Sequence, residues 1–248
     1  MGDVQFGAQI GLPERVQGRV GFVTGLQMEA DLIRKAARAL KMKVPPIAVA
    51  GPGAPRPDLA VERLIADGAT AVASLGLAGA LAPGLKAGTV VIPSDIRARD
   101  LSDRLPVDPA WRSMLAVLDA EGVALSDGPI VSSRTPLLSA ADKATLHQDS
   151  GGHAVDMESY ALALAAARRG LPFLAIRAIS DTADTAIPAA AARAMTADGR
   201  LTLTPILLAL ITREERLSVF RELGRQSALA TGALRRVLMR TLPQLSGE

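Results

Sequence analysis

The sequence contains no cysteine and is very poor in aromatic residues. Its 248 residues include one Trp, one Tyr, four Phe and two histidines, His147 and His153. The lack of cysteine excludes a disulfide framework and a thiol nucleophile, and two histidines argue against a histidine-rich metal site. Catalysis would therefore use carboxylates, hydroxyls, arginine or lysine, and we expect neither a bound metal nor an organic cofactor.

Long apolar runs and a targeting signal are also missing. No stretch approaches the ~20 apolar residues of a membrane span. Residues 1–23 lack a basic segment followed by an apolar one, which is the pattern of a secretory signal. We therefore expect a cytoplasmic protein.

The net charge is only +3, and it is unevenly distributed. Between Thr204 and Leu242 there are seven arginines and three glutamates, so the basic excess lies in this segment. A nucleic-acid-binding surface usually interleaves basic and aromatic residues over a broad area, and this chain has few aromatics. We expect no nucleic-acid partner.

Aliphatic residues dominate what is present, and short apolar runs alternate with helical patterns. Hydrophobic residues make up 49% of the chain. We predict strands within 19–25, 46–51, 88–95, 128–133 and 172–181, the last completing the sheet, and helices within 28–41, 57–68, 108–122, 139–148 and 157–170. This alternation predicts an α/β fold, a three-layer α/β/α sandwich around a mostly parallel or mixed central sheet. We expect one domain over 1–248, with a core over about 18–200 and a helical extension over about 204–242.

The C-terminal extension has apolar residues near one face of each expected helix and arginines elsewhere. The apolar positions are Leu207, Leu210, Ile211 and Leu217 in the first part, and Leu234, Val237, Leu238 and Leu242 in the second. We favour packing of these faces on the body of the protein or at a subunit interface. The alternative is an amphipathic, basic surface that contacts an anionic inner membrane face or shelters a lipid-linked nucleoside.

Carboxylates and glycines follow several expected strands, at the sheet edge where ligands of open α/β folds bind. The groups are Gly25 with Glu29, Gly76 with Gly79, Asp156 with Glu158, and Ser180 with Asp181. A single acid in such a place is usually a helix cap or a turn residue. A pair of acids, each after an apolar strand, would converge on one edge and indicates a site.

Two glycine-containing segments are ambiguous. We predict a tight turn between strand and helix for residues 76–81, and the alternative is that Gly76 and Gly79 let the backbone approach an anion or a ribose. We interpret the "GPG" loop at 51–53 as structural.

Four segments carry a resemblance to a known family. They are "GLQMEAD" at 25–31, "GLAGALAPGLKAGTVVIPSD" at 76–95, "VDMES" at 155–159 and "FLAIRAISDTAD" at 173–184. Over nearly the whole chain to about residue 184, the sequence resembles the nucleoside phosphorylase and methylthioadenosine/adenosylhomocysteine nucleosidase superfamily. Within it, the sequence most resembles the hopanoid-associated phosphorylases, which act on adenosylhopane. The resemblance implies a homo-oligomeric enzyme that cleaves the purine N-glycosidic bond of a 5′-substituted adenosine and releases adenine.

The resemblance assigns roles to residues that suit this chemistry. Asp181 matches the acid that protonates the purine N7, for which it must carry a proton in a dry, apolar site, and Ser180 is placed to orient it. Glu158 matches the carboxylate that binds the 2′ and 3′ hydroxyls of the ribose, and Met157 the apolar floor beneath the sugar. Asp156 has a less defined role in substrate binding.

Further substrate contacts are expected from the backbone and from aliphatic side chains. Ala78 and Gly79 belong to the segment that would approach the ligand. Leu137 or Pro136 lies where related enzymes place an aromatic residue against the base.

The resemblance leaves the nucleophile open. The alignment puts Ala30 at the position of the water-activating glutamate of the nucleosidases, with Glu29 one residue earlier. It puts Ser74 and Leu77 at phosphate-binding positions of the phosphorylases. We favour phosphorolysis, with inorganic phosphate as co-substrate, because an enzyme that keeps its acid and its ribose anchor without that glutamate suits an anionic nucleophile.

The expected phosphate donors are few. They are the backbone at Gly25 and Gly76 and the guanidinium of Arg134, with Arg97 and Arg34 as further candidates. The alternatives to a phosphorylase are a hydrolytic nucleosidase for methylthioadenosine or adenosylhomocysteine, and a nucleoside-binding protein that has lost catalysis.

Overall fold

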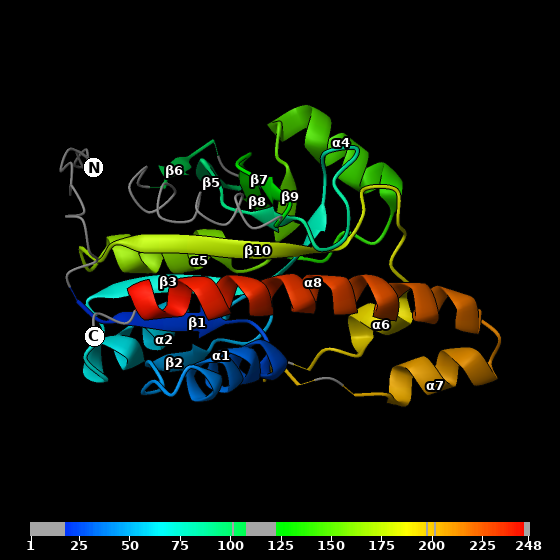
Figure 1. The fold of residues 1–248 in the computed structure, drawn as a ribbon. Coiled ribbons are helices and arrows are strands. Elements are labelled where there is room, and N and C mark those ends of the chain that lie inside the picture. Colours follow the sequence, from blue (N-terminus) through cyan, green and yellow to red (C-terminus); the bar gives the residue numbers. More distant parts are fainter. Residues whose placement is uncertain (1–17, 101, 108–122, 197, 201, 246–248) are drawn as a thin grey trace.

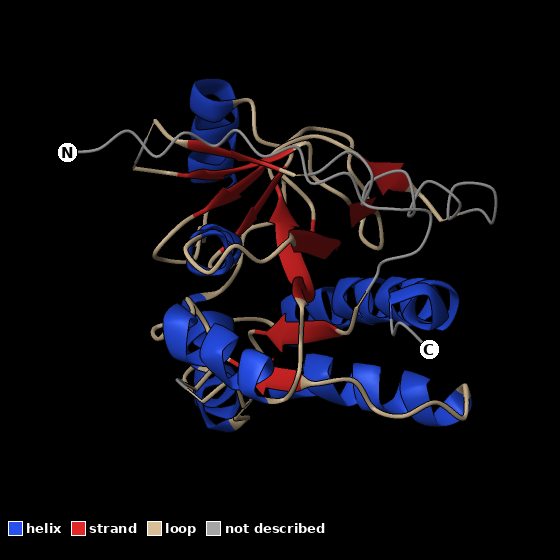
Figure 2. Cartoon of the chain, turned by 90° about the vertical axis from the view of Figure 1, so that its left-hand side faces the viewer, coloured by secondary structure: helices blue, strands red, loops and turns tan. Residues whose placement is uncertain are grey.

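A computed structural model describes residues 18–100, 102–107, 123–196, 198–200 and 202–245. It confirms the predicted α/β class, with a ten-stranded mixed sheet between helices (Figures 1 and 2). The helix expected within 108–122 lies outside the described residues.

The strands are β1 (Val20–Thr24), β2 (Ile47–Val49), β3 (Ala71–Ala80), β4 (Val90–Val91), β5 (Asp95–Ala98), β6 (Arg104–Pro106), β7 (Leu125–Ser126), β8 (Ile130–Ser132), β9 (Ala154–Asp156) and β10 (Phe173–Asp181). The helices are α1 (Gln27–Ala39), α2 (Pro57–Ala66), α4 (Ala140–Ser150), α5 (Ser159–Ala167), α6 (Ala189–Arg193), α7 (Thr204–Ile211) and α8 (Leu217–Leu245). The sheet order is β6-β5-β8-β9-β3-β10-β4-β7, and β1 lies beside β3 with β2 outside it.

The helices form a layer on either side of the long central strands β3 and β10. On one side α8 runs along β10 and packs against α1, and on the other side α2 packs against α5 (Figure 1). Small and branched aliphatic side chains fill the spaces between these layers. In α4, the predicted N-cap Ser139 accepts a hydrogen bond at 3.0 Å from the amide of Asp142, which satisfies a free donor of the first turn.

The apolar face of the last helix is part of the core. Its buried residues include Leu234, Val237, Leu238 and Leu242, all with no exposed surface. This confirms the favoured interpretation for the second half of the extension, which packs on the body. These four side chains are therefore not available to a membrane.

The short helix α7 differs from α8 because its apolar side chains are mostly uncovered. Ala209 is its one buried residue, whereas Leu207, Leu208 and Ile211 are 55%, 58% and 79% exposed. Within the described part of the chain, no helix is long and apolar enough to cross a membrane.

One local prediction about the sheet is wrong. Residues 76–80 form the end of β3 and not a turn, because β10 pairs in parallel with β3 from Val72 to Gly79. The strand β10 is the last strand in the chain, as predicted, and it lies inside the sheet between β3 and β4.

The pairing of β3 leaves a gap on one of its edges. Its first four residues, Ala71 to Ser74, pair with β1, and its last two, Gly79 and Ala80, pair with β9. Among the described residues, no strand pairs with this edge of β3 between Ser74 and Gly79. The backbone in this gap is therefore free to contact side chains or a ligand.

Candidate active site

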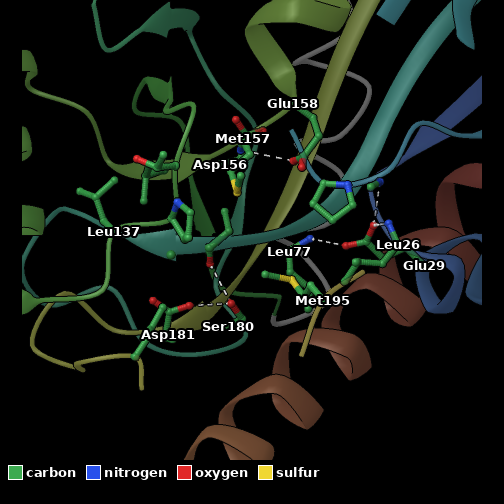
Figure 3. Close-up of a pocket in the computed structure, with 18 of the residues that line it drawn as sticks. Leu26, Glu29, Leu77, Leu137, Asp156, Met157, Glu158, Ser180, Asp181 and Met195 are labelled. Atoms are coloured by element: carbon green, nitrogen blue, oxygen red, sulfur yellow. Dashed lines mark hydrogen bonds between the residues drawn. The ribbon is translucent and has the colours of Figure 1, made fainter. Parts of the chain in front are cut away.

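A pocket opens at this gap, at the carboxyl ends of β1, β3, β9 and β10. Its volume is about 220 Å³, and its lining combines aliphatic side chains with the carboxyl groups of Glu29, Asp156, Glu158 and Asp181 (Figure 3). All four groups of residues that follow strands contribute to this lining, except that Gly76 lies behind Glu29. The expected convergence of acids on one sheet edge is confirmed.

Glu158 lies at the start of α5, where its carboxylate closes one end of the pocket. Its Oε1 accepts a hydrogen bond of 2.7 Å from the amide of Gly53. The "GPG" loop thus contributes to the site by holding this carboxylate, and Pro52 of the same loop lines the pocket, so the interpretation of the loop as merely structural needs revision. Burial and the nearby Asp156 raise the pKa of Glu158 to about 7 against the opposing effect of Arg177.

Asp156 does not present a free carboxylate to the pocket. Its Oδ2 accepts a hydrogen bond of 2.8 Å from Nε of Arg177, and its Oδ1 accepts one of 2.6 Å from Ser132. The amide and hydroxyl of Ser159 also donate to it. Arg177 in turn donates to the hydroxyl of Ser74 at 2.8 Å, so this buried network supports β9 and the start of α5.

Asp181 ends β10, and an irregularity in the sheet aims it into the pocket. The parallel register between β10 and β3 shifts between Ile179 and Asp181, so Ser180 is the extra residue of a bulge. The hydroxyl of Ser180 donates a hydrogen bond of 2.7 Å to Oδ1 of Asp181. This contact is the one that the sequence predicts for Ser180, whose role in orienting the acid stays a prediction.

The expectation of purely apolar surroundings for Asp181 is wrong. The ammonium of Lys143, from α4, lies 2.5 Å from Oδ2 of Asp181, and the lysine side chain has no exposed surface. Sequence reasoning missed this residue. The available signal is that Lys143 shares the buried face of its helix with Leu146, three residues later.

Glu29 also lines the pocket, although the alignment places Ala30 at the family's catalytic position. Ala30 has no exposed surface and belongs to the core, whereas the Glu29 carboxylate lies in the gap of β3. Oε1 accepts from the amide of Leu77 at 2.9 Å, and Oε2 accepts from the amides of Gly25 and Leu26 at 3.1 and 2.9 Å. Burial raises the pKa of Glu29, and these amides and Arg177 oppose the rise.

The expected phosphate ligands do not assemble around the pocket. The amide of Gly25 is donated to Glu29, and a Cβ atom at Gly76 would lie 2.8 Å from Oε1 of the same residue. Arg134 is exposed and does not line the pocket. Arg97 donates to Asp95, and Arg34 forms an exposed ion pair with Asp31.

The remaining expected contacts do lie at the pocket. The lining includes Ala78, Gly79, Pro136, Leu137 and Met157. Figure 3 shows the side chains of Leu137 and Met157 at the pocket. The described residues contain no group of three or more carboxylates and histidines that could hold a metal ion.

Comparisons with known proteins agree with this geometry. A family model described as "Phosphorylase superfamily" matches residues 33–212. A comparison with curated proteins gives no match.

Solved structures share the fold at low sequence identity. The methylthioadenosine/adenosylhomocysteine nucleosidase of Neisseria meningitidis, in complex with methylthio-immucillin-A, is 22% identical with a TM-score of 0.63, covering 90% of this chain and 99% of its own. The corresponding nucleosidase of Helicobacter pylori is 16% identical with a TM-score of 0.64, covering 90% and 98%. The futalosine hydrolase of Helicobacter pylori is 18% identical with a TM-score of 0.58, covering 66% and 88%.

The fold and the pocket define an α/β protein with a carboxylate-rich site at the gap where the edge of β3 passes from β1 to β9. Because the family model covers well over half of the chain, the protein belongs to the phosphorylase superfamily. The family is one of phosphorylases, and the solved structures that share its fold with this chain include nucleosidases.

Proposed function

We propose that the protein hydrolyses the purine N-glycosidic bond of a 5′-substituted adenosine and releases adenine. The observation that carries this proposal is the meeting of Glu29, Glu158 and Asp181 in one pocket of about 220 Å³. Cleavage of such a bond needs an anchor for the sugar, an acid for the departing base and a nucleophile at C1′. Three carboxyl groups in different surroundings can divide these tasks.

Glu158 is the proposed ribose anchor and Asp181 the proposed acid. Both oxygens of an ionised Glu158 can accept the 2′ and 3′ hydroxyls together, and the Gly53 amide fixes its position. Asp181 gives a proton to N7 of the purine, which turns the base into a neutral leaving group.

Glu29 is the proposed base that activates water. A buried carboxylate whose pKa is raised binds a proton more strongly than an exposed one, so it is a better general base near neutral pH. The amides of Gly25, Leu26 and Leu77 occupy three of the roughly four lone-pair sites of this carboxylate and leave one, on Oε1, for a water molecule.

Phosphorolysis, which the sequence favours, is the alternative nucleophile chemistry. Phosphorolysis was favoured because the sequence places no water-activating glutamate of the first helix in the site. Glu29 of that helix does line the pocket, so this reason no longer applies. The amides of Gly25 and Leu77, the natural donors for a phosphate in this gap, are already donated to Glu29. A carboxylate in this position would also repel the anion.

The 5′ substituent is proposed to be a bulky apolar group, as in adenosylhopane. Ile187 and Met195, on either side of α6, add apolar surface to the pocket, and α6 packs against α7. The uncovered leucines of α7 would continue this apolar path to a membrane or to a second subunit. Methylthioadenosine and adenosylhomocysteine are the smaller alternatives.

One assay tests the reaction and the nucleophile together. Adenine release is measured from adenosylhopane, methylthioadenosine and adenosylhomocysteine, with and without phosphate. We expect phosphate-independent release, and a loss of roughly 10²- to 10⁴-fold in kcat for Glu29→Gln. The matched control is Asp31→Asn, an exposed acid on the same helix, which should be as active as the wild type.

Two results would contradict the proposal in different ways. Release that requires phosphate and survives Glu29→Gln would establish phosphorolysis. Binding of the nucleoside without any adenine release, under both conditions, would identify a non-catalytic binding protein.

A further inference from the structure

Lys143 is a fully buried lysine that has no role in the reaction described above. Its side chain has no exposed surface, and burying an ammonium group is costly unless its surroundings compensate. An aliphatic residue would fill this place on α4 at lower cost. The contacts of the lysine therefore show what compensates its buried charge.

The contacts of Lys143 are three acceptors, and only one of them is charged. Nζ lies 2.5 Å from Oδ2 of Asp181, 3.0 Å from the carbonyl oxygen of Thr182 and 2.9 Å from that of Thr185. An ammonium has three donors, whereas a neutral amine has two donors and one lone pair. The two carbonyls can hold the two N–H groups of a neutral amine, so the third proton is the one directed at Asp181.

We propose that Lys143 is the positioning residue and proton partner of Asp181, resupplying the proton that Asp181 gives to the purine. This inference rests on the proposed function, in which Asp181 is the acid. The contact between Nζ of Lys143 and Oδ2 of Asp181 is a direct, charge-assisted hydrogen bond, so a proton can pass between the two atoms without an intervening group.

One turnover passes a single proton from Lys143 through Asp181 to the purine. A proton moves from Nζ of Lys143 to the Asp181 carboxylate, and the resulting acid passes it to N7. The C1′–N9 bond breaks at the same time, and its electron pair goes to the purine. Lys143 is then a neutral amine beside an ionised Asp181. The attacking water loses one proton to Glu29, and release of that proton to solvent and its return to the Lys143 amine restore the resting state.

The other groups on the elements around Lys143 do not compete for this role. Asp142 and Asp184 are exposed; the hydroxyl of Thr182 and, to a lesser degree, the charge of Lys143 lower the pKa of Asp184. His147, one turn later on α4, has its Nδ1 2.7 Å from the carbonyl oxygen of Gly152. Gln226 of α8 is neutral and contacts Thr182 and Thr185.

The test is the pH dependence of kcat for the wild type, Lys143→Met and Lys143→Gln. With Lys143 present, Asp181 can be reprotonated from Nζ in neutral and mildly alkaline solution, so wild-type kcat should hold its plateau there. Without it, Asp181 is the only proton source, and the alkaline limb should move by at least about one pH unit toward acid. We expect a loss of about 10²-fold at pH 8.5, a loss under about 10-fold at pH 6, and KM within about threefold of wild type.

Lys143→Gln keeps a hydrogen-bond donor for Asp181 and guards against misfolding of the methionine variant. Lys35→Gln, on the exposed side of α1, is the matched control and should leave the profile unchanged. Equal losses at all pH values, or an unshifted alkaline limb, would overturn the inference. So would a wild-type kcat that already declines around pH 7, which needs no variant. Failure of the proposed function is distinct, because the wild type itself would then release no adenine.

Discussion

A Cβ atom at Gly76 would lie 2.8 Å from Oε1 of Glu29. The missing side chain in β3 is therefore what lets this carboxylate occupy the gap of the sheet. The same relationship recurs three residues later, where a Cβ atom at Gly79 would lie 2.8 Å from Oδ2 of Asp181. The two glycines thus make room for two acids and not for a turn.

Gly76→Ala is expected to displace Glu29 without removing any carboxylate. The atoms that the new Cβ would meet all belong to the Glu29 carboxyl group, which three backbone amides hold in place. We therefore expect a destabilisation of about 1–3 kcal/mol and at least a tenfold loss of adenine release. Urea unfolding and the adenine assay measure the two effects.

Gly224→Ala is the control for this substitution. Gly224 is in α8 and has nothing within 4 Å of its Cβ position, so alanine should stabilise by roughly 0.5–1 kcal/mol. Full activity of Gly76→Ala would mean that Glu29 can move without consequence and would count against its role as the base.

Glu158 should make stability depend on pH with an unusual sign. Its folded pKa of about 7 lies above the ordinary value of 4.5, so between these values the folded state holds the proton that the unfolded state has lost. Stability therefore falls as pH rises through this window. The partly exposed side chain reduces the effect, and we expect it to be on the order of 2 kcal/mol.

Glu158→Gln removes this titration, so the variant should gain stability relative to the wild type from pH 5 to pH 8. Urea unfolding at the two pH values measures the difference. The wild-type kcat/KM should also rise through about pH 7 as Glu158 ionises and binds the ribose. A glutamine variant with the same pH dependence as the wild type would show that another group titrates.

Much of this site follows from the sequence because it is local. Strands that alternate with helices put Glu158 and Asp181 at the same sheet edge. Ser180 precedes Asp181 in the chain and contacts its carboxyl group. The pattern of apolar residues also predicts that the face of α8 is buried.

The parts that the sequence does not reveal depend on contacts between distant residues. Glu29 satisfies the rule for a helix cap through the amide of Leu26, and its second role appears only in the bond to Leu77, 48 residues away. Lys143 belongs to a helix whose other charges are exposed, and its partner Asp181 is 38 residues later. Neither pairing follows from helical or strand periodicity, since it depends on how the layers pack.

Arg177→Met should be strongly destabilising, because it leaves the Asp156 carboxylate buried without its cation. The pair is almost fully buried, with side-chain exposures of 2% for Arg177 and 0% for Asp156. Breaking such a pair costs about 3–5 kcal/mol, whereas replacing both charges costs much less. The double variant with Asp156→Asn should therefore recover most of the loss in urea unfolding.

Arg200→Met provides the comparison for an exposed ion pair. Arg200 and Asp198 are 74% and 61% exposed, so the variant should unfold in urea close to the wild type. A double variant no more stable than Arg177→Met alone would show that Arg177 acts through Ser74 or through packing, and not through its charge on Asp156.

The uncovered face of α7 predicts binding to a lipid surface. Leu207 and Ile211 lie one helical turn apart and are 55% and 79% exposed, and Leu203 and Leu208 extend the same surface. Insertion of such side chains into the interface is favourable by roughly 25 cal/mol per Å² of buried apolar area, and the nearby Arg213 and Arg216 would be attracted to anionic headgroups. The double variant Leu207→Glu, Ile211→Glu should lower co-sedimentation with vesicles that contain anionic lipid at least tenfold.

The control is Leu59→Glu, which changes an equally exposed leucine on α2 and should bind vesicles like the wild type. Unchanged vesicle binding, together with a smaller mass in analytical ultracentrifugation, would instead assign this face to a second copy of the chain.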